Sequence, residues 1–281
     1  MRLSASGRSW RQWVGPGAFG PAPSRCSTAH PLRLFRRSGR LAHHTGVGRR
    51  NTRRMPVLLP VMRIGIIGAG HIGGSLTRRL TALGHEVQVA NSRAPETLTE
   101  LAEETGATPV WARDAAKDAD LVILSIPQKN VPDLEPGIFA SRKDGAPIIE
   151  TNNYYPQQRD GLIAAIEDGQ TESAWVSEQI GQPVVKVFNG IFWKFLLERG
   201  KSAGEEGRIA LPIAGDDAAA KVIVSDLVDE LGFDPVDGGT IAESWRQQPG
   251  TPVYGQHGSA DETRAALEEA SPERTADWKA A

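Results

Sequence analysis

From residue 62 onward, short apolar runs alternate with longer segments whose apolar residues recur at helical spacing. The runs predict strands and the segments predict amphipathic helices. Strands are expected at 64–67, 87–90, 108–110, 121–126, 147–150, 183–188 and 209–215. Helices are expected at about 71–83, 95–106, 191–196, 217–231 and beyond 255, with helical turns at 115–118 and 243–245. This alternation favours an α/β fold, a Rossmann-type doubly wound parallel sheet followed by a small C-terminal α/β domain.

The C-terminal part contains the most sharply bounded helix. Asp216 and Asp217 can cap a helix over 217–231, and Gly232 can end it. The chain is then expected to turn back over 233–239. The residues expected on the apolar face of the helix are Val222, Ile223, Leu227, Val228 and Leu231.

Two segments before that helix carry less specific patterns. The aromatic residues of 191–196 are expected in the core, because aromatic stripes at helical spacing usually pack inside. The glycine-rich stretch 201–207 is expected as a loose surface loop, with a mobile flap as the alternative.

A Gly-x-Gly-x-x-Gly sequence directly follows the first strand and opens the first helix. Gly68 allows the tight turn, Gly70 lets the backbone approach a pyrophosphate, and Gly73 lets the helix lie close to the strand. The same turn contains His71 and Ile72 at the helix N-terminus, where free N–H groups favour phosphate. The context predicts a dinucleotide site, in which His71 packs or contacts the pyrophosphate.

The end of the second strand indicates which nucleotide the site holds. An NAD site usually has an acidic residue about 20 residues after the glycines, and its carboxylate would repel a 2′-phosphate. This chain has Asn91, Ser92 and Arg93 there instead. Arg93 can pair with a phosphate, and Ser92 can add a hydrogen bond. The prediction is NADP(H), and the alternative is a solvated turn that binds nothing.

Two more strand ends are expected beside the nicotinamide. Ligands of doubly wound sheets bind at the carboxyl ends of the strands, which places Ser125, Ile126 and Pro127 near the pyrophosphate and the nicotinamide ribose. The loop Thr-Asn-Asn-Tyr-Tyr-Pro at 151–156 follows the next strand and has more hydrogen-bonding groups than a connection requires. It is either part of the substrate site or an ordinary turn.

Charge separates a leader from the body. Residues 1–61 hold 12 of the 32 basic residues and no Asp or Glu, so 20 basic and 34 acidic residues remain for 62–281. An over-extended gene start before Met62 or Met55 is the favoured explanation of the leader, and a transit peptide or a basic tail are the alternatives. In each case the leader is expected to be disordered and outside the fold.

Composition excludes several kinds of chemistry from the body. The only cysteine, Cys26, lies in the leader, so disulfides, a Cys nucleophile and Cys-ligated metals are excluded from 62–281, and no metal is expected. The acidic body argues against nucleic-acid and membrane partners, and no apolar run reaches the length of a membrane span. A cytoplasmic protein is expected, or one of an organelle matrix if the leader is a transit peptide.

Several motifs together resemble the NADPH-dependent F-420 reductase family. Its members are coenzyme F-420-dependent NADP oxidoreductases, and reductase domains of STEAP metalloreductases are relatives. The motifs are the glycine turn, Asn-Ser-Arg at 91–93, Lys-Val-Phe-Asn at 186–189, and the stretches 212–221 and 231–238. The last two stretches are the most specific and the glycine turn the least, and the resemblance covers residues 62 to about 250.

The resemblance implies a Rossmann domain at 62–190 and a small C-terminal domain at 191–281, often paired in a homodimer. It implies hydride transfer between NADP(H) and a flavin-like or deazaflavin ring, with coenzyme F-420 as candidate co-substrate. By position, the family's phosphate contacts match Gly68, Gly70, Ile72 and Gly73, and its 2′-phosphate contacts match Ser92 and Arg93. The end of the fourth strand matches Ser125 and Pro127. Polar positions near the nicotinamide match Asn152 and Asn189. The Asn-Asn-Tyr-Tyr-Pro loop departs from the archaeal F-420 enzymes, which puts the deazaflavin acceptor in question.

Asn152, Tyr154 and Asn189 are the candidate catalytic residues. Hydride transfer between stacked rings needs proximity and exclusion of water more than a strong acid or base. An imine or carbonyl reductase is the alternative, and it would need a proton donor such as Tyr154, Tyr155 or Lys186. A non-catalytic NADP(H)-binding regulator is a further alternative.

Overall fold

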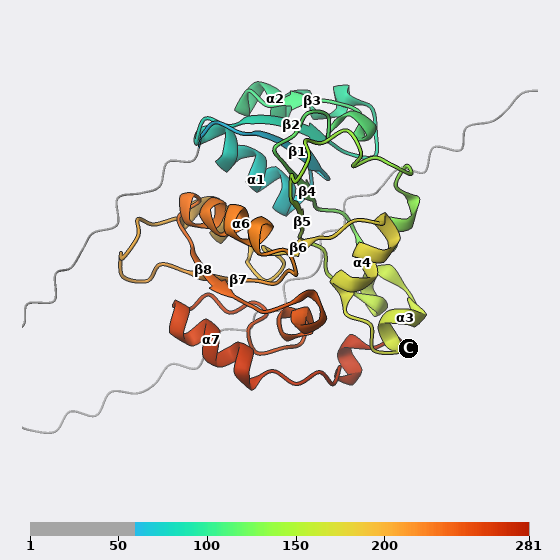
Figure 1. The fold of residues 1–281 in the computed structure, drawn as a ribbon, viewed down its shortest axis with the longest axis vertical. Coiled ribbons are helices and arrows are strands. Elements are labelled where there is room, and N and C mark those ends of the chain that lie inside the picture. Colours follow the sequence, from blue (N-terminus) through green and yellow to red (C-terminus); the bar gives the residue numbers. More distant parts are fainter. Residues whose placement is uncertain (1–59, 281) are drawn as a thin grey trace, which may run out of the picture. The chain divides into compact units, whose positions relative to one another are not determined.

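The computed structural model describes residues 60–280, so the expectations for the leader up to residue 59 lie outside the described residues. A six-stranded sheet has the order β3-β2-β1-β4-β5-β6, and every neighbouring pair is parallel (Figure 1). Its strands are β1 (Arg63–Ile67), β2 (Glu86–Ala90), β3 (Thr108–Pro109), β4 (Leu121–Leu124), β5 (Ile148–Glu150) and β6 (Val185–Lys186). This is the strand order of the Rossmann fold, so the predicted fold class is confirmed.

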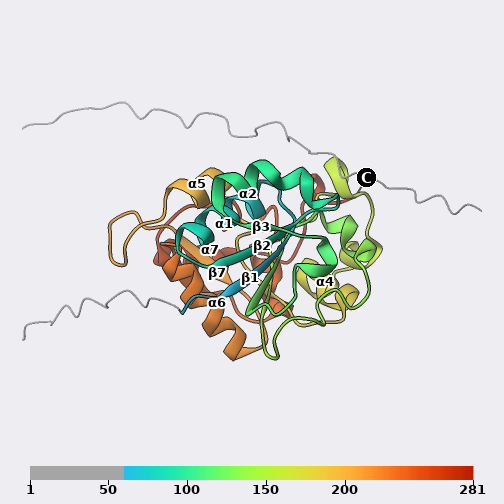
Figure 2. The same ribbon diagram turned by 90° about the horizontal axis from the view of Figure 1, so that it is seen from above.

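Helices cover both faces of the sheet. On one face Ile64 shares a core with Leu76 of α1 (His71–Ala82) and with residues of α5 (Trp193–Glu198) and α6 (Ala218–Glu230). On the other face Val122 shares a core with Trp175 of α4 (Glu172–Ile180). Figure 2 shows α1 and α4 on opposite sides of the strands. The α-helices are α1 (His71–Ala82), α2 (Thr99–Thr105), α3 (Ala164–Glu167), α4 (Glu172–Ile180), α5 (Trp193–Glu198), α6 (Ala218–Glu230) and α7 (Ala260–Glu269). Shorter turns are η1 (Pro95–Leu98), η2 (Ala112–Asp114), η3 (Gln128–Asp133), η4 (Pro156–Asp160), η5 (Ile241–Gln247) and η6 (Ala276–Trp278).

A second sheet of two parallel strands, β7 (Ala210–Ile213) and β8 (Asp234–Asp237), lies between α6 and α7 (Figure 1). The prediction that 233–239 only turns back was therefore wrong. Both strands of a two-stranded sheet are edge strands. Pro235 has no N–H to donate, and an edge strand tolerates it. The domain boundary between residues 190 and 191 stays a prediction.

The apolar face of α6 was predicted correctly except at Val222. Asp217 caps the helix by accepting hydrogen bonds from the backbone N–H groups of Ala219 and Ala220. Val222 is 60% exposed, and Val224 is fully buried in its place. The buried face follows positions 220, 224, 227, 228 and 231, a spacing of three and four that leaves Val222 on the solvent side.

The segment 157–182 received no prediction, and it forms α3 and α4. The Thr171 hydroxyl caps α4 by accepting from the N–H of Ala174, and Gly181 ends the helix in the left-handed conformation. The buried residues of α4 include Glu172 and Ser173, so its inner face is partly polar and gives little apolar periodicity. In the described residues, 60–280, no helix has the length and apolar character needed to cross a membrane.

Candidate nucleotide site at the carboxyl edge of the sheet

The glycine turn after β1 is held by two close backbone approaches. Gly68 has φ +112°, and a Cβ there would lie 2.0 Å from the carbonyl oxygen of Ser125. A Cβ on Gly73 would lie 1.8 Å from the carbonyl oxygen of Gly68. The N–H of Gly68 also donates to the carbonyl oxygen of Ala90, at 2.8 Å. The turn therefore joins the ends of β1, β2 and β4, and only glycine fits at positions 68 and 73.

Gly70 differs from the other two glycines because, among residues 60–280 and apart from its two chain neighbours, no atom lies within 4 Å of its Cβ position. Gly70 is exposed and is the N-cap of α1, with no side chain capping the helix. The first N–H groups of α1 are consequently left to a ligand or to water, and the positive end of the helix favours an anion. This arrangement fits a pyrophosphate.

The turn after β2 is preorganised by Asn91. The Oδ1 of Asn91 accepts from the N–H of Arg93 at 2.7 Å, and its Nδ2 donates to the hydroxyl of Thr97 at 3.0 Å. Ser92 and Arg93 are exposed. Within residues 60–280 the Arg93 guanidinium forms no ion pair, so it can pair with a phosphate group without breaking an existing contact.

Asn152 links the ends of β4 and β5. Its Oδ1 accepts from the N–H of Ile126 at 3.1 Å, so the predicted stretch Ser125 to Pro127 lies directly beside it. Asn152 is 3% exposed, and within residues 60–280 its Nδ2 has no hydrogen-bond partner. A buried amide N–H without a partner costs free energy unless a ligand or water accepts from it.

Tyr154 and Asn189, predicted as catalytic candidates, have their polar groups occupied by the protein. The Tyr154 hydroxyl donates to the carbonyl oxygen of Gly161 and accepts from the N–H of Ile163, and burial raises its pKa to about 12. The Nδ2 of Asn189 donates to the side-chain oxygen of Asn153 and to the backbone carbonyl of Gln247, and its Oδ1 accepts from the Nε2 of Gln247. These contacts favour structural roles, and the catalytic role of both residues stays a prediction.

Tyr155 pairs with Tyr254, which the sequence analysis did not single out. The two hydroxyls are hydrogen-bonded, and the Arg159 guanidinium lies 4.8 Å from the centre of the Tyr155 ring. Burial raises the pKa of both phenols, so both stay protonated at neutral pH. The segment of Tyr254 reaches the sheet edge because the N–H of Gly255 donates to the carbonyl oxygen of Gly190, at 3.1 Å. No local motif could have indicated a pair 99 residues apart.

The ring of Trp193 stacks on the ring of His71, with centroids 4.9 Å apart and planes 14° apart. His71 packs, as predicted. The prediction that the aromatic residues of 191–196 lie in the core was wrong for Phe192, which is 39% exposed, and for Trp193, which is half-buried. The reason is the direction of α5, whose first residues face the glycine turn while Leu196 enters the core.

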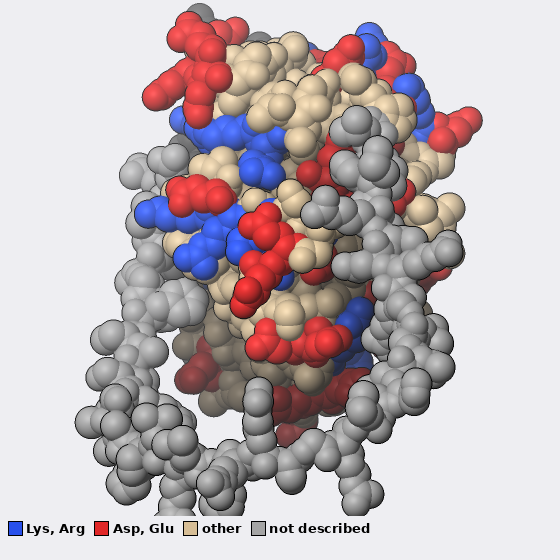
Figure 3. All heavy atoms as spheres, turned by 90° about the vertical axis from the view of Figure 1, so that its left-hand side faces the viewer, with Lys and Arg blue, Asp and Glu red and all other residues tan. Residues whose placement is uncertain are grey.

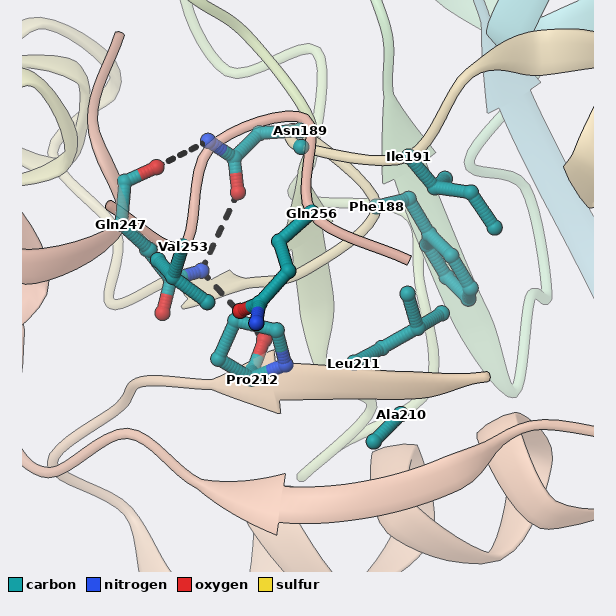
Figure 4. A pocket seen from close by; sticks show the side chains of 10 residues that line it. Phe188, Asn189, Ile191, Ala210, Leu211, Pro212, Gln247, Val253 and Gln256 are labelled. Carbon is teal, nitrogen blue, oxygen red and sulfur yellow. Dashed lines mark hydrogen bonds between the residues drawn. The ribbon is translucent and has the colours of Figure 1, made fainter. Parts of the chain in front are cut away.

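A small hollow lies beside the loop after β6, between Phe188, Leu211 and Val253 (Figure 4). It holds about one water molecule and is too small for a ring system. Lys186, considered above as a proton donor, is fully buried with its ammonium 3.2 Å from the Glu150 carboxylate. In the part of the chain that the structure describes, no group of three His, Cys, Asp or Glu side chains is placed to hold a metal ion.

The strand order, the glycine turn and the uncapped start of α1 define a Rossmann-type dinucleotide-binding protein. The sequence profile of the family described as NADP oxidoreductase, coenzyme F-420-dependent, matches residues 63–154. A hypothetical protein from Sinorhizobium meliloti of known structure is 30% identical with a TM-score of 0.58, over 70% of this chain and 95% of that chain. The chain belongs to this NADP oxidoreductase family.

Two further proteins are similar to this chain. A structure from an Arthrobacter species, described as an F-420-dependent NADP-reductase, shares the fold with a TM-score of 0.52 and 22% identity, over 65% of this chain and 87% of that chain. Metalloreductase STEAP3 of Rattus norvegicus is 25% identical over 65% of this chain and 35% of that protein. The chain spans little more than a third of the curated relatives it matches, at 37%, 36% and 35% of their lengths.

Proposed function

We propose that this protein transfers hydride between NADP(H) and a flavin-like or deazaflavin acceptor, with coenzyme F-420 as the candidate. The observation that carries the cofactor assignment is the open space at Gly70 in front of the uncapped start of α1. The exposed Arg93 at the end of the neighbouring strand supports the phosphorylated nucleotide over NAD(H). Family membership supports the acceptor class.

Each group of site residues is assigned to one part of the cofactor. Gly68, Gly70, His71, Ile72 and Gly73 would hold the pyrophosphate, and Asn91, Ser92 and Arg93 the 2′-phosphate. Ser125, Ile126, Pro127 and Asn152 would line the nicotinamide ribose. Bound NADPH supplies the hydride, and the chain contributes orientation and exclusion of water, so transfer between stacked rings needs no acid from the protein.

The acceptor is tested with the purified full-length chain by following NADPH absorbance with F-420, FMN and a ferric chelate in separate reactions. We expect rapid oxidation with F-420 and little with the other two. Rapid oxidation with FMN or ferric chelate instead would assign a different acceptor. Tight NADPH binding without turnover on any of them would favour the non-catalytic regulator.

Arg93→Ala is expected to weaken NADPH binding by about 1–3 kcal/mol, because a charge-assisted pair with the 2′-phosphate is lost. NADH has no 2′-phosphate, so its affinity should barely change. Titration calorimetry with both nucleotides measures the difference. Equal weakening of NADPH and NADH would contradict the 2′-phosphate assignment.

An imine or carbonyl reductase is the second candidate, and the Tyr155–Tyr254 pair favours it because two protonated phenols border the carboxyl edge of the sheet. If the substrate needs a proton, Tyr155→Phe should lower kcat on a cyclic imine by roughly 100-fold, the usual contribution of a general acid. With F-420 as acceptor the same variant should change kcat little. Unchanged turnover of a cyclic imine by Tyr155→Phe would remove this role.

The proposal extends to the partners and the compartment. We place the protein in the cytoplasm as a homodimer acting on a small molecule, without a nucleic-acid or membrane partner. On the described part of the face drawn in Figure 3, Lys and Arg side chains are interspersed with Asp and Glu, and this mixture does not favour a polyanion. Light scattering on the purified chain tests the dimer.

A further inference from the structure

Three ionisable side chains meet in the interior next to the loop that carries Asn152. They are Glu150 at the end of β5, Lys186 at the end of β6 and Glu172 at the start of α4, and all three side chains are 0% exposed. The Lys186 ammonium lies 3.2 Å from Oε2 of Glu150 and 3.9 Å from Oε2 of Glu172. The network joins two strands of the sheet to a helix on its face.

The network is larger than a single ion pair, because Arg274 also joins it and gives two acids and two bases. Arg274 lies 3.3 Å from the other oxygen of Glu172, and the Ser173 hydroxyl donates to Glu150 at 2.7 Å. Burial raises the pKa of Glu172 to about 7, and in the described part of the chain its Oε2 has no hydrogen-bond partner. Replacing a buried ion pair with apolar residues is often neutral or stabilising, so net stability alone does not account for this network.

Three of the four polar groups of Asn152 are hydrogen-bonded, two of them by the network. The Lys186 ammonium donates to the backbone carbonyl of Asn152 at 3.0 Å, and the backbone N–H of Asn152 donates to the Glu150 carboxylate. The Asn152 Oδ1 accepts from the N–H of Ile126, on the strand end expected beside the nicotinamide ribose. The remaining group, Nδ2, is buried and has no hydrogen-bond partner among the described residues. The arrangement is that of a donor fixed in place for a ligand.

We propose that Lys186 is a positioning residue, which together with Glu150 fixes Asn152 so that its Nδ2 donates to an oxygen of the nicotinamide riboside half of the cofactor. This inference rests on the proposed function. Lys186 itself cannot touch the cofactor, because its ammonium is enclosed by Glu150, Glu172 and the Asn152 carbonyl. Its effect must therefore pass through Asn152 and be confined to the nicotinamide half.

The test compares NADP+ with adenosine 2′,5′-bisphosphate, which has the 2′-phosphate half and lacks the nicotinamide riboside, by calorimetry on the full-length chain. Lys186→Met is expected to weaken NADP+ binding at least tenfold and to leave the bisphosphate within twofold of wild type. Asn152→Ala should show the same pattern, and the double variant should lose little more than either single one. The fragment 2′-phospho-ADP-ribose has the second ribose but lacks the nicotinamide. If the variants weaken its binding as well, the ribose is the acceptor of the Asn152 hydrogen bond; if they do not, the carboxamide is.

Lys186→Met leaves two carboxylates in the interior, so a second variant guards against misfolding. Combining Lys186→Met with Glu150→Gln restores the charge balance. The double variant still lacks the Lys186 bond to Asn152, so we expect the selective loss of NADP+ affinity to remain. The matched control is Glu230→Gln, which breaks a buried pair with His85 at 3.1 Å near the amino end of β2. This control should leave the preference between the two ligands unchanged.

The outcomes separate the two proposals. Wild-type affinity of Lys186→Met for NADP+, or equal weakening of NADP+ and the bisphosphate, would make Lys186 purely structural and overturn the inference. Failure of the wild-type chain to bind either ligand would instead overturn the proposed function on which the inference rests.

Discussion

Gly70→Ala is expected to reduce NADPH affinity at least ~100-fold, or about 3 kcal/mol, while the protein keeps its fold and its melting temperature. The backbone at Gly70 has φ −76° and ψ −160°, which alanine adopts without strain. In the described part of the chain, no atom beyond the two neighbouring residues lies within 4 Å of the added methyl group, so the methyl group would obstruct an approaching pyrophosphate without disturbing the fold. Calorimetry with NADPH and thermal unfolding of the apoprotein measure the two quantities.

Gly73→Ala is the contrasting variant. Its methyl group would lie 1.8 Å from the carbonyl oxygen of Gly68, so the turn itself must shift. We expect this variant to lose both melting temperature and NADPH affinity, whereas Gly70→Ala loses only affinity. Wild-type NADPH binding by Gly70→Ala would mean that the pyrophosphate does not approach the turn at this glycine.

Glu172→Gln is expected to make the stability of the protein less dependent on pH. Burial raises the pKa of Glu172 to about 7 in the folded protein from its usual 4.5. Between these values the folded state holds more protons than the unfolded state, so the wild type loses stability as the pH rises from about 4.5 to 7. Glutamine stays neutral, and the variant should gain on the order of 3 kcal/mol relative to wild type between pH 4.5 and pH 8.

Urea unfolding of both proteins at pH 5 and pH 8 measures this gain. The control is Glu104→Gln, because Glu104 is exposed and its hydrogen bond with Arg78 lowers its pKa, which keeps it ionised over this range. The stability difference between that control and wild type should be the same at both pH values. A pH-independent difference for Glu172→Gln as well would show that Glu172 is ionised throughout.

The nucleotide turn was predicted in detail because its information is local. Gly68, Gly70 and Gly73 lie within six consecutive residues, and their order between an apolar strand and a helix already defines the turn. The Asn91 turn is equally local, since its side chain bonds the backbone two residues on. Short-range backbone geometry of this kind can be read without knowledge of the rest of the fold.

The sequence predicted that the loop 151–156 follows a strand at the carboxyl edge of the sheet, and the structure places it after β5. The assignment of this edge to the nicotinamide stays a prediction, in which Asn152 and Tyr154 were equal candidates. Hydrogen bonding distinguishes the two side chains, because the Tyr154 hydroxyl is bonded to Gly161 and Ile163, while the Nδ2 of Asn152 has no partner among residues 60–280. Hydrogen-bonding capacity is visible in a sequence, whereas its occupancy is not.

The residues that the sequence analysis missed are joined across long separations. Glu172 belongs to a helix with a partly polar inner face, and it matters only because Lys186 and Arg274 lie beside it. The spacing of Trp193 predicts a core residue, whereas the direction of α5 places its ring on His71. Contacts of this kind depend on how elements pack, which the spacing of residues along one element does not encode.

The sequence by itself determined the strand–helix alternation, the sheet class and the glycine turn, because each depends on neighbouring residues and backbone periodicity. The preference for a 2′-phosphorylated nucleotide is likewise a prediction from neighbouring residues. Tertiary structure alone decided that 234–237 becomes the edge strand β8 and that the Tyr155 and Tyr254 hydroxyls meet. It alone decided, too, that Lys186 is enclosed by acids and that the Nδ2 of Asn152 has no hydrogen-bond partner among residues 60–280. The physical reason is that burial and hydrogen-bond partners are properties of packed elements, and distant parts of the chain supply them.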